Sequence, residues 1–437
     1  MLRLTLRNLA ANKARFLMTT FAVVLGVGFV VSSFVMSDGL RSTFGKLSDD
    51  ITSGTDLLLR PTSDFGDPLP LDEDLIIEVM GVDGVTNAVA FMESDENQIQ
   101  PASLDLRLGQ KAYRVRASFL PGKGKSVLSR IEDLTYAEID LENGAVLERN
   151  CVYIIELLEH LDLPESISAL ANPKSSTGRL DIFTRVIANE AAQFDFVPAG
   201  YQGKIYAEVC PRTFSVMVRT GSRLSQLRFR RRAGNQDEHA DFRLSDRELR
   251  ERHKQAAIVD GPISARGGLL LSVHLAGADE AQWAGFRAQT YTDVIDVDRV
   301  GAYSTRDFWE PIPARPDQRL ILDPHQFYIL ASKERMRVPS DLAAEMVPID
   351  PSMGEFRAHY AGFFDPGFGD QASGPSARAV LEVRSHEVPF ILENGQFVGR
   401  LVFEKMTEQP DTLYGQAGST NNYQSQGLKL SKHFIAD

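Results

Sequence analysis

A glutamate inside an apolar stretch is the strongest candidate for acid/base chemistry in this sequence. Glu382 follows Val380 and Leu381 and precedes Val383, a run typical of a strand. Burial among apolar side chains raises the pKa of a carboxyl group, because it disfavours the charged form. A glutamate tuned in this way accepts and returns a proton near neutral pH, which contributes about 10²–10⁴ to a rate.

A second segment has the residue types of a loop that binds an anion and orients water. It runs from Lys174 through Ser175 and Ser176 to Arg179, so the two hydroxyls precede the guanidinium by about one helical turn. Hydroxyls can hold a water molecule by hydrogen bonds, and a guanidinium binds negative charge. If the fold brings this loop to Glu382, the two segments together can activate a water molecule.

The C-terminal tail offers a cover for such a site. From Tyr414 to Gly427 it is rich in Gly, Ser, Asn and Gln, a composition that is usual for a frayed terminus. Tyr414 and Tyr423 can cover a planar ring, because aromatic side chains bring a large flat apolar surface. The amides of Gln424 and Gln426 can donate hydrogen bonds to anionic oxygens. We therefore expect the tail to fold over the site.

The composition limits the classes of function. The 437 residues include 47 Lys and Arg against 59 Asp and Glu, a formal net charge of -12. This balance argues against a nucleic acid polymer as partner, because phosphate neutralisation needs clustered cations. Cys151 and Cys210 lie far apart, so neither a disulfide scaffold nor a thiolate zinc site is expected.

Short strands separated by turns must position these residues. Period-2 alternation predicts two strands between Ser103 and Leu120, at 103–109 and 112–120. The same order of signals recurs roughly 170 residues later, too long a period for a solenoid repeat. A charged linker with a helix from Ser245 separates the two sets. The pattern indicates a duplicated, mainly β domain of the sandwich or jelly-roll type.

One stretch near the N-terminus departs from this pattern. Phe16–Met36 has no charged residue and would be about 31 Å long as a helix, enough to span a bilayer. Arg3, Arg7, Lys13 and Arg15 precede it, so the positive-inside rule predicts a single-pass membrane protein with the following chain outside. A signal peptide and a buried soluble helix are the alternatives.

The basic start, this span and the segment LPLDEDLIIEVMGVDGVTNAVA at 69–90 resemble the beginning of an ABC-transporter permease of the FtsX/MacB type. In that family a basic amphipathic helix leads into a membrane helix and then an extracytoplasmic domain. No second apolar run long enough to span a bilayer follows in this sequence. We therefore do not expect transport by this chain alone.

Five motifs follow one another from about residue 96 to 437: SLDLRLG at 103–109, KSSTGR at 174–179, FDPGF at 364–368, VLE at 380–382 and NYQSQG at 422–427. In these motifs the chain resembles the dCTP deaminases of the dUTPase-like fold, in a duplicated long form. Two positions depart from the family pattern, because Lys174 replaces an Arg and Asn422 replaces a Lys.

The resemblance implies two dUTPase-like distorted jelly-roll β-domains in tandem, preceded by one transmembrane helix. It implies that Glu382 is the catalytic acid/base. The substrate-binding residues that it implies are Lys174, Ser175, Ser176 and Arg179 for the triphosphate and the water, Asp365, Val380 and Leu381 for the sugar and base, and Tyr414, Tyr423, Gln424 and Gln426 in the tail.

The motifs are divided between the halves. The first half has the Ser-Ser loop but carries Phe196–Tyr201 where the Asp-Pro-Gly motif belongs, and its counterpart of the glutamate is Glu208, the alternative catalytic residue. The second half has Asp365 and Glu382 but carries DPSMGEFR at 350–357 in place of the loop. We infer one composite site for each pair of halves, formed within one chain or between chains.

The activity that the resemblance implies is zinc-independent hydrolysis of dCTP to dUTP and ammonia. The H-x-E and C-x-x-C signature of zinc deaminases is absent from the sequence. Mg²⁺ is expected through the substrate triphosphate, dUTP or dTTP as product or effector, and a homo-oligomer as the assembly. The alternatives are a dUTP pyrophosphatase, a bifunctional dCTP deaminase/dUTPase and, in another class, a membrane-anchored permease fragment with a nucleotide-binding domain. We expect the catalytic domain to be cytoplasmic, because dCTP is scarce outside.

These inferences predict six parts along the chain. They are the basic N-terminus with the membrane helix at 1–40, the permease-like segment at 41–95, the first β-domain at 96–232, the charged linker at 233–262, the second β-domain at 263–409 and the tail at 410–437.

Overall fold

The computed structural model describes residues 98–231, 242–277, 282–348, 356–359, 362–371, 374–385, 387–416 and 422–435. All of them belong to one compact unit, Gly54–Asp437. The predicted membrane span and the permease-like segment lie outside the described residues. No helix among the residues that are described is long and apolar enough to cross a membrane.

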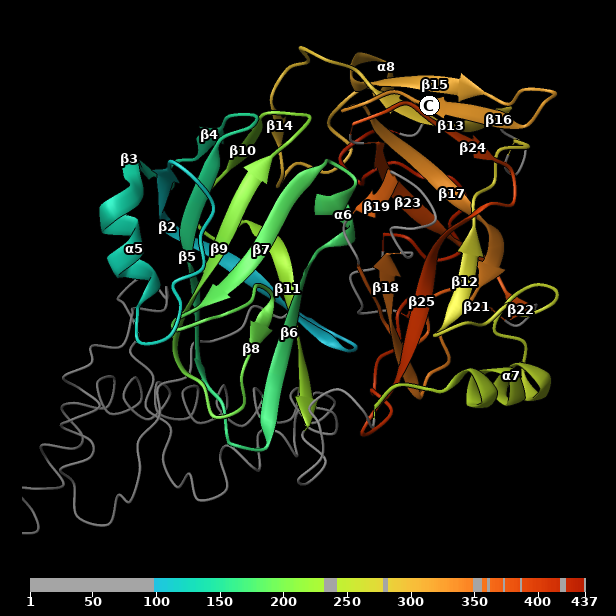
Figure 1. Cartoon of the computed structure of the whole chain (residues 1–437), viewed down its shortest axis with the longest axis horizontal. Helices are drawn as coiled ribbons and strands as arrows, with labels where there is room; N and C mark the ends of the chain where they lie inside the picture. The colour runs from blue at the N-terminus through green and yellow to red at the C-terminus, as the bar shows by residue number, and fades with distance from the viewer. Residues whose placement is uncertain are drawn as a thin grey trace, which may run out of the picture. The chain divides into compact units, whose positions relative to one another are not determined.

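The first half is mainly β. Seven strands follow the order β7-β9-β5-β2-β11-β6-β8 in one sheet, and β1 and β3 pair with β2 beside this path (Figure 1). The bounds are β1 (Ile99–Gln100), β2 (Ser103–Val115), β3 (Thr135–Asp140), β4 (Ala145–Leu147), β5 (Val152–Asp162), β6 (Ile167–Pro173), β7 (Ile182–Ala188), β8 (Phe196–Val197), β9 (Gln202–Pro211), β10 (Val216–Val218) and β11 (Arg223–Arg231).

The two strands predicted between Ser103 and Leu120 are in fact a single strand, β2, of 13 residues. The prediction of a break was wrong because β2 continues while it changes partner, from β11 in its first part to β3 and β5 after Leu108. The strand bends at Gly109, where an added Cβ would lie 2.5 Å from the carbonyl oxygen of Glu156. This close approach explains why glycine occupies the bend.

The second half is also mainly β. Its sheets have the orders β12-β25-β18-β20 and β15-β13-β17-β23-β19, with the pairs β16-β24 and β21-β22 beside them. The bounds are β12 (Leu269–Ser272), β13 (Trp283–Ala288), β14 (Ile295–Asp296), β15 (Trp309–Pro313), β16 (Arg319–Leu322), β17 (Phe327–Met336), β18 (Leu342–Pro348), β19 (Phe356–His359), β20 (Phe363–Phe364), β21 (Asp370–Gln371), β22 (Gly374–Pro375), β23 (Ala377–Ser385), β24 (Phe390–Glu393) and β25 (Phe397–Lys405).

Strand pairing in the second half repeats that of the first half. The pair β17–β23 corresponds to β5–β9, and β18–β25 corresponds to β6–β11. In this correspondence β23, which carries Glu382, is the counterpart of β9, which carries Glu208. The recurring sequence signals therefore correspond to recurring antiparallel pairs.

Four helices occur among the described residues: α5 (Val127–Leu134), α6 (Ser175–Gly178), α7 (Asp246–Gln255) and α8 (Thr305–Phe308). The helix predicted from Ser245 is confirmed as α7. Ser245 and Glu248 form a capping box, in which each side chain bonds the backbone N–H of the other. Leu249 anchors this polar helix in the core of the second half.

The two halves are joined directly by strand pairing. The strand β14 of the second half pairs in parallel with β10 of the first half, which already pairs with β4. Next to this strand, Arg219 bonds Asp296 and Asp298 with nitrogen–oxygen distances of 2.9 and 2.7 Å. The segment around β14 is therefore fixed to the first half although it belongs to the second.

Candidate active site

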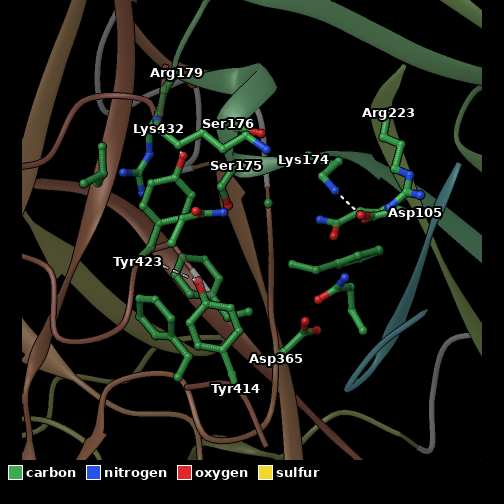
Figure 2. Close-up of a pocket in the computed structure, with 18 of the residues that line it drawn as sticks. Asp105, Lys174, Ser175, Ser176, Arg179, Arg223, Asp365, Tyr414, Tyr423 and Lys432 are labelled. Atoms are coloured by element: carbon green, nitrogen blue, oxygen red, sulfur yellow. Dashed lines mark hydrogen bonds and ion pairs between the residues drawn. The ribbon is translucent and has the colours of Figure 1, made fainter. Parts of the chain in front are cut away.

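A cavity of about 700 Å³ is lined by residues of both halves (Figure 2). Pockets of this size hold ligands of the size of a nucleotide. The structure therefore brings together, within one chain, the two motif sets that the sequence divides between the halves. The predicted residues that line the cavity are Lys174, Ser175, Ser176, Arg179, Asp365, Val380, Glu382, Tyr414, Tyr423 and Gln426.

The Ser-Ser loop is one turn of helix, α6, between β6 and β7. Lys174 is its N-cap residue, and two amides of the turn donate to the Lys174 carbonyl. The turn places Ser175 and Ser176 on the cavity wall and Arg179 at its end. The hydroxyl of Ser431 in the tail donates to the Ser176 carbonyl at 2.9 Å, so the tail holds the turn in place.

Glu382 lies in β23, which is hydrogen-bonded to β17 on one side and β19 on the other. Its side chain is only 7% exposed. Burial raises the pKa of Glu382 to about 8, and the positive charge of Arg179 opposes this shift. The Oε1 atom of Glu382 lies 4.0 Å from Nε of Arg179. Glu382 can therefore exchange a proton near neutral pH.

The C-terminal tail orients Arg179. Its Nη2 donates to Oε1 of Gln426 at 2.9 Å, and its Nη1 donates to the carbonyl of Lys429 at 3.0 Å. The guanidinium carbon lies 3.8 Å from the centre of the Tyr423 ring, a cation–π contact. The tail thus covers the site, as the sequence predicts, and binds the loop of the first half through Arg179.

Asp365 forms a second bridge between the halves. Its Oδ1 lies 3.3 Å from Nη2 of Arg228, which comes from β11 of the first half. The guanidinium of Arg228 also lies 4.0 Å from the centre of the Phe363 ring. Burial raises the pKa of Asp365, and Arg228 counteracts this effect. The ion pair fixes the carboxylate at the cavity wall, near the aromatic side chain of Tyr414 (Figure 2).

One end of the cavity is rich in cations that the sequence analysis missed. Lys432 and Arg223 line it together with Lys174, and Lys174 is paired with Asp105. Burial lowers the pKa of Lys432, and the neighbouring charge of Lys174 lowers it further. Asp105 lies in the SLDLRLG motif, which could have suggested it. Lys432 and Arg223 belong to no motif, so only the folded tail and β11 reveal their place.

Two predicted residues do not line the cavity. The side chain of Leu381 points to the other face of β23 and is buried in the core of the second half. Gln424 instead holds the tail to the turn after Asp365, because its amide donates to the carbonyl of Gly367 at 3.0 Å and accepts from the amide of Gly369 at 3.0 Å. Gln424 therefore helps to hold the C-terminal tail in its position over the cavity.

The alternative glutamate, Glu208, is also outside the cavity. It is 2% exposed, and its pKa is raised by burial. A hydrogen bond from Ser118 and the charge of Arg185 counteract this shift. Its Oε2 atom has no hydrogen-bond partner. The carboxyl group is buried like that of Glu382, but no phosphate-binding loop faces it in the part of the chain that is described.

A connection between equivalent elements takes a different course in the two halves. This difference explains why Glu208 is covered whereas Glu382 lines a cavity. In the first half the connection between β2 and α5 brings Ser118 into hydrogen-bond contact with the carboxyl group of Glu208. In the second half the connection between β13 and α8 carries β14 to the first half instead. Val297 and Asp298 of this connection then line the cavity. The connection in the first half thus contacts Glu208, whereas its counterpart in the second half forms part of the cavity wall.

The dCTP deaminase N-terminal and C-terminal domain families match residues 75–233 and 245–434. A crystal structure of 2'-deoxycytidine 5'-triphosphate deaminase from Agrobacterium tumefaciens is 54% identical, with a TM-score of 0.68, and the match covers 72% of this chain and 93% of that one. A dUMP-forming dCTP deaminase from Methanosphaera stadtmanae is 29% identical over 197 residues, 43% of this chain and 92% of that protein. A dCTP deaminase from Natronomonas pharaonis is 31% identical over 146 residues, 32% of this chain and 71% of that protein.

The first matched segment begins at residue 75, inside the segment 41–95 that resembles a permease. The permease resemblance stays a prediction for the residues before it. The family match covers both halves that build the cavity, and the identity to the Agrobacterium structure extends over nearly all of that chain. The chain therefore belongs to the 2'-deoxycytidine 5'-triphosphate deaminase family.

Proposed function

We propose that the chain hydrolyses dCTP to dUTP and ammonia in the cavity between its halves, with Glu382 as the acid/base. The observation that supports this assignment is the pairing of Glu382 with Arg179 beside Ser175 in a nucleotide-sized cavity. The two dUTPase-like β-domains in tandem, with the boundaries given above, are part of the same proposal. The matching strand pairs of the two halves support it.

In the proposed reaction a water molecule attacks C4 of the cytosine ring. Ionised Glu382 accepts a proton from this water as the C4–O bond forms. The C4=N3 double bond opens as the C4–O bond forms, and Glu382 passes this proton to N3. The remaining hydroxyl proton then passes through the carboxylate to the amino group, the C4–N bond breaks, and ammonia leaves as C4=O forms. Arg179 lies close enough to stabilise the carboxylate form of Glu382, and the hydroxyl of Ser175 can orient the water. Atoms balance, because one water is consumed and one ammonia is released.

The cationic end of the cavity is the proposed triphosphate site. Lys174, Lys432 and Arg223 supply positive charge there, and the turn α6 adds hydroxyl and backbone donors. We propose that Mg²⁺ enters bound to the triphosphate. No group of three or more His, Cys, Asp or Glu residues that could hold a metal occurs among the described residues. Phosphate oxygens would supply most of the ligands, and Asp105, which pairs with Lys174, is a carboxylate at the same end of the cavity.

A bifunctional reaction that continues to dUMP is the second candidate. Similar proteins from Methanosphaera stadtmanae and Methanobrevibacter smithii are named dUMP-forming dCTP deaminases. The buried Asp365 offers a second carboxylate in the same cavity, and its raised pKa would let it hold a proton. The products distinguish the two reactions, because only the bifunctional enzyme releases pyrophosphate.

The test uses the full chain with dCTP and Mg²⁺, and it measures ammonia, dUTP, dUMP and pyrophosphate. Ammonia equal to dUTP, without pyrophosphate, supports simple deamination. Ammonia equal to dUMP and pyrophosphate supports the bifunctional reaction. Pyrophosphate from dUTP without ammonia from dCTP would support a dUTP pyrophosphatase. Nucleotide binding without any product would favour a membrane-anchored binding protein and contradict the proposal.

A further inference from the structure

Two ion pairs of opposite polarity connect the loop after α6 with β23. Arg179 faces Glu382, and two positions further along both segments Asp181 faces Arg384. Residues two apart on a strand point to the same face, so Glu382 and Arg384 share one face of β23. Each half thus contributes one cation and one anion, and the charges alternate across the joint between the halves.

The Asp181–Arg384 pair is buried and fixed by further bonds. The side chains are 1% and 10% exposed. The hydroxyl of Thr213 donates to Oδ2 of Asp181 at 2.5 Å and accepts from Nη2 of Arg384 at 2.9 Å. Arg384 also donates to the carbonyl of His325. Breaking one partner of such a pair would leave an uncompensated buried charge.

The Asp181–Arg384 pair has no counterpart beside Glu208 among the described residues. In the first half the residue two positions after Glu208 is Cys210, where the second half has Arg384 two positions after Glu382. Fold alone does not require an arginine at this position, because the corresponding strand β9 forms without one. The arginine occurs where a strand must be held against the loop of the other half.

We propose that Asp181 and Arg384 form a positioning pair that holds Glu382 in register with Arg179 and thereby sets the rate of deamination. This inference rests on the proposed role of Glu382. Neither residue lines the cavity, so each acts through the backbone and charge of its neighbour rather than on the substrate. The pair fixes the segments on which both cavity residues lie, two positions away in each case.

The charges near Glu382 give this inference a signature that mere stability does not share. Arg179 lowers the pKa of Glu382 and Asp181 raises it. Other charged or titratable groups on the elements around it include Arg378 and Arg384 on β23 and Tyr414 and Tyr423 of the tail. On β19, His359 is the residue paired with Glu382 in the strand register. With both partners present, the positive charge of Arg384 lies beside the negative charge of Asp181. Removing one of them leaves the other unbalanced near the carboxyl group.

The test compares Asp181→Asn and Arg384→Met with a control at another joint between the halves. The control is Arg230→Met, which removes an arginine that is also 10% exposed and pairs with Glu404 across the halves, but does not line the cavity. Measurements are kcat, KM for dCTP, the pH dependence of kcat/KM and Tm for the full chain. Arg384→Lys and Thr213→Val are milder variants for the case that Arg384→Met does not fold.

We expect Asp181→Asn and Arg384→Met to lower kcat about tenfold or more with less than about threefold change in KM. Arg230→Met should lower Tm by a similar amount and leave kcat within about threefold. Arg384→Lys should restore part of kcat. The acid limb of kcat/KM should move to lower pH in Asp181→Asn and to higher pH in Arg384→Met.

Two results would overturn the inference: losses of kcat no larger than those of Arg230→Met at equal loss of Tm, or acid limbs that do not move in opposite directions. For Arg384→Lys and Thr213→Val, a reduced Tm with unchanged kcat would also overturn the inference. Failure of the proposed function itself would look different, because the unsubstituted chain would then release no ammonia from dCTP, or Glu382→Gln would keep the activity of the unsubstituted chain.

Discussion

Arg179 and Glu382 come from different halves of the chain and meet with 4.0 Å between Nε and Oε1. The glutamate is carried by strand β23, between β17 and β19, and the arginine ends the short turn α6. The tail then bonds the same arginine through Gln426 and packs Tyr423 on it. Formation of the site therefore requires that both halves and the tail are folded against one another.

Replacing Glu382 by Gln removes the acid/base while keeping the size of the side chain. We expect kcat to fall about 10²-fold or more with little change in the Kd for dCTP. Ammonia release measures the first quantity, and calorimetric titration with dCTP measures the second. Glu208→Gln is the matched control, because this second buried glutamate lies outside the cavity. An active Glu382→Gln variant, or equal losses in both variants, would assign the acid/base elsewhere.

The raised pKa of Glu382 predicts how activity depends on pH. The base must be ionised to accept a proton from water, and burial raises its pKa to about 8. In the free enzyme kcat/KM should therefore rise with pH by about tenfold per unit below this value and level off above it. A profile that is flat from about pH 6 to pH 9, measured after correction for the ionisation of dCTP itself, contradicts this assignment.

The same shift predicts a pH-dependent stability. Glu382 stays protonated in the folded chain up to about pH 8, whereas its ordinary pKa of 4.5 makes it ionised in the unfolded chain. Between these values the folded state binds more protons, so the free energy of unfolding falls as the pH rises. Glu382→Gln removes this contribution. Its Tm relative to the unsubstituted chain should increase from about pH 5 to about pH 8.5, and a constant difference would argue against the shift.

Lys432 should contribute to the binding of the triphosphate. It lines the cationic end of the cavity next to Lys174. We expect Lys432→Gln to raise KM for dCTP about tenfold with kcat within about threefold, because a charge-assisted contact contributes about 1.5–3 kcal/mol. Lys405→Gln is the control, because Lys405 does not line the cavity and its half-exposed side chain pairs with Glu248 at 2.9 Å. Equal effects of the two substitutions would remove Lys432 from the site.

The sequence predicts the segments of the site better than their details. Local motifs identified Glu382, Asp365 and the loop ending at Arg179, and their division between the halves implied a composite site. The pair of Asp181 and Arg384 could not be predicted, because each residue has meaning only when strands that are distant in sequence become neighbours.

Long-range packing also explains the other differences. The resemblance implied that Leu381 and Gln424 share the site with their neighbours in the motifs, but successive side chains of a strand point to opposite faces, and Gln424 bonds the turn at Gly367 and Gly369 instead. The covering of Glu208 depends on whether a connection contacts its own half or crosses to the other half, and no local signal decides this. The bend in β2 depends likewise on the partners that the strand meets.

Because the cavity is complete within one chain, inactive variants of the two halves should not complement each other. The Arg179→Ala chain lacks the cation but keeps Glu382. The Glu382→Gln chain lacks the acid/base but keeps Arg179. If the site formed between chains, mixing the two variants would bring intact Glu382 to intact Arg179 and restore part of the activity. With the site inside one chain, every cavity keeps one defect.

We therefore expect no activity from the mixture beyond the sum of the two variants, even after joint unfolding and refolding. Unsubstituted chain refolded alongside either variant controls for losses during refolding. Recovery of about a quarter of the unsubstituted activity, the fraction that random pairing between chains would give in hybrid assemblies, would show that the composite site is shared between chains.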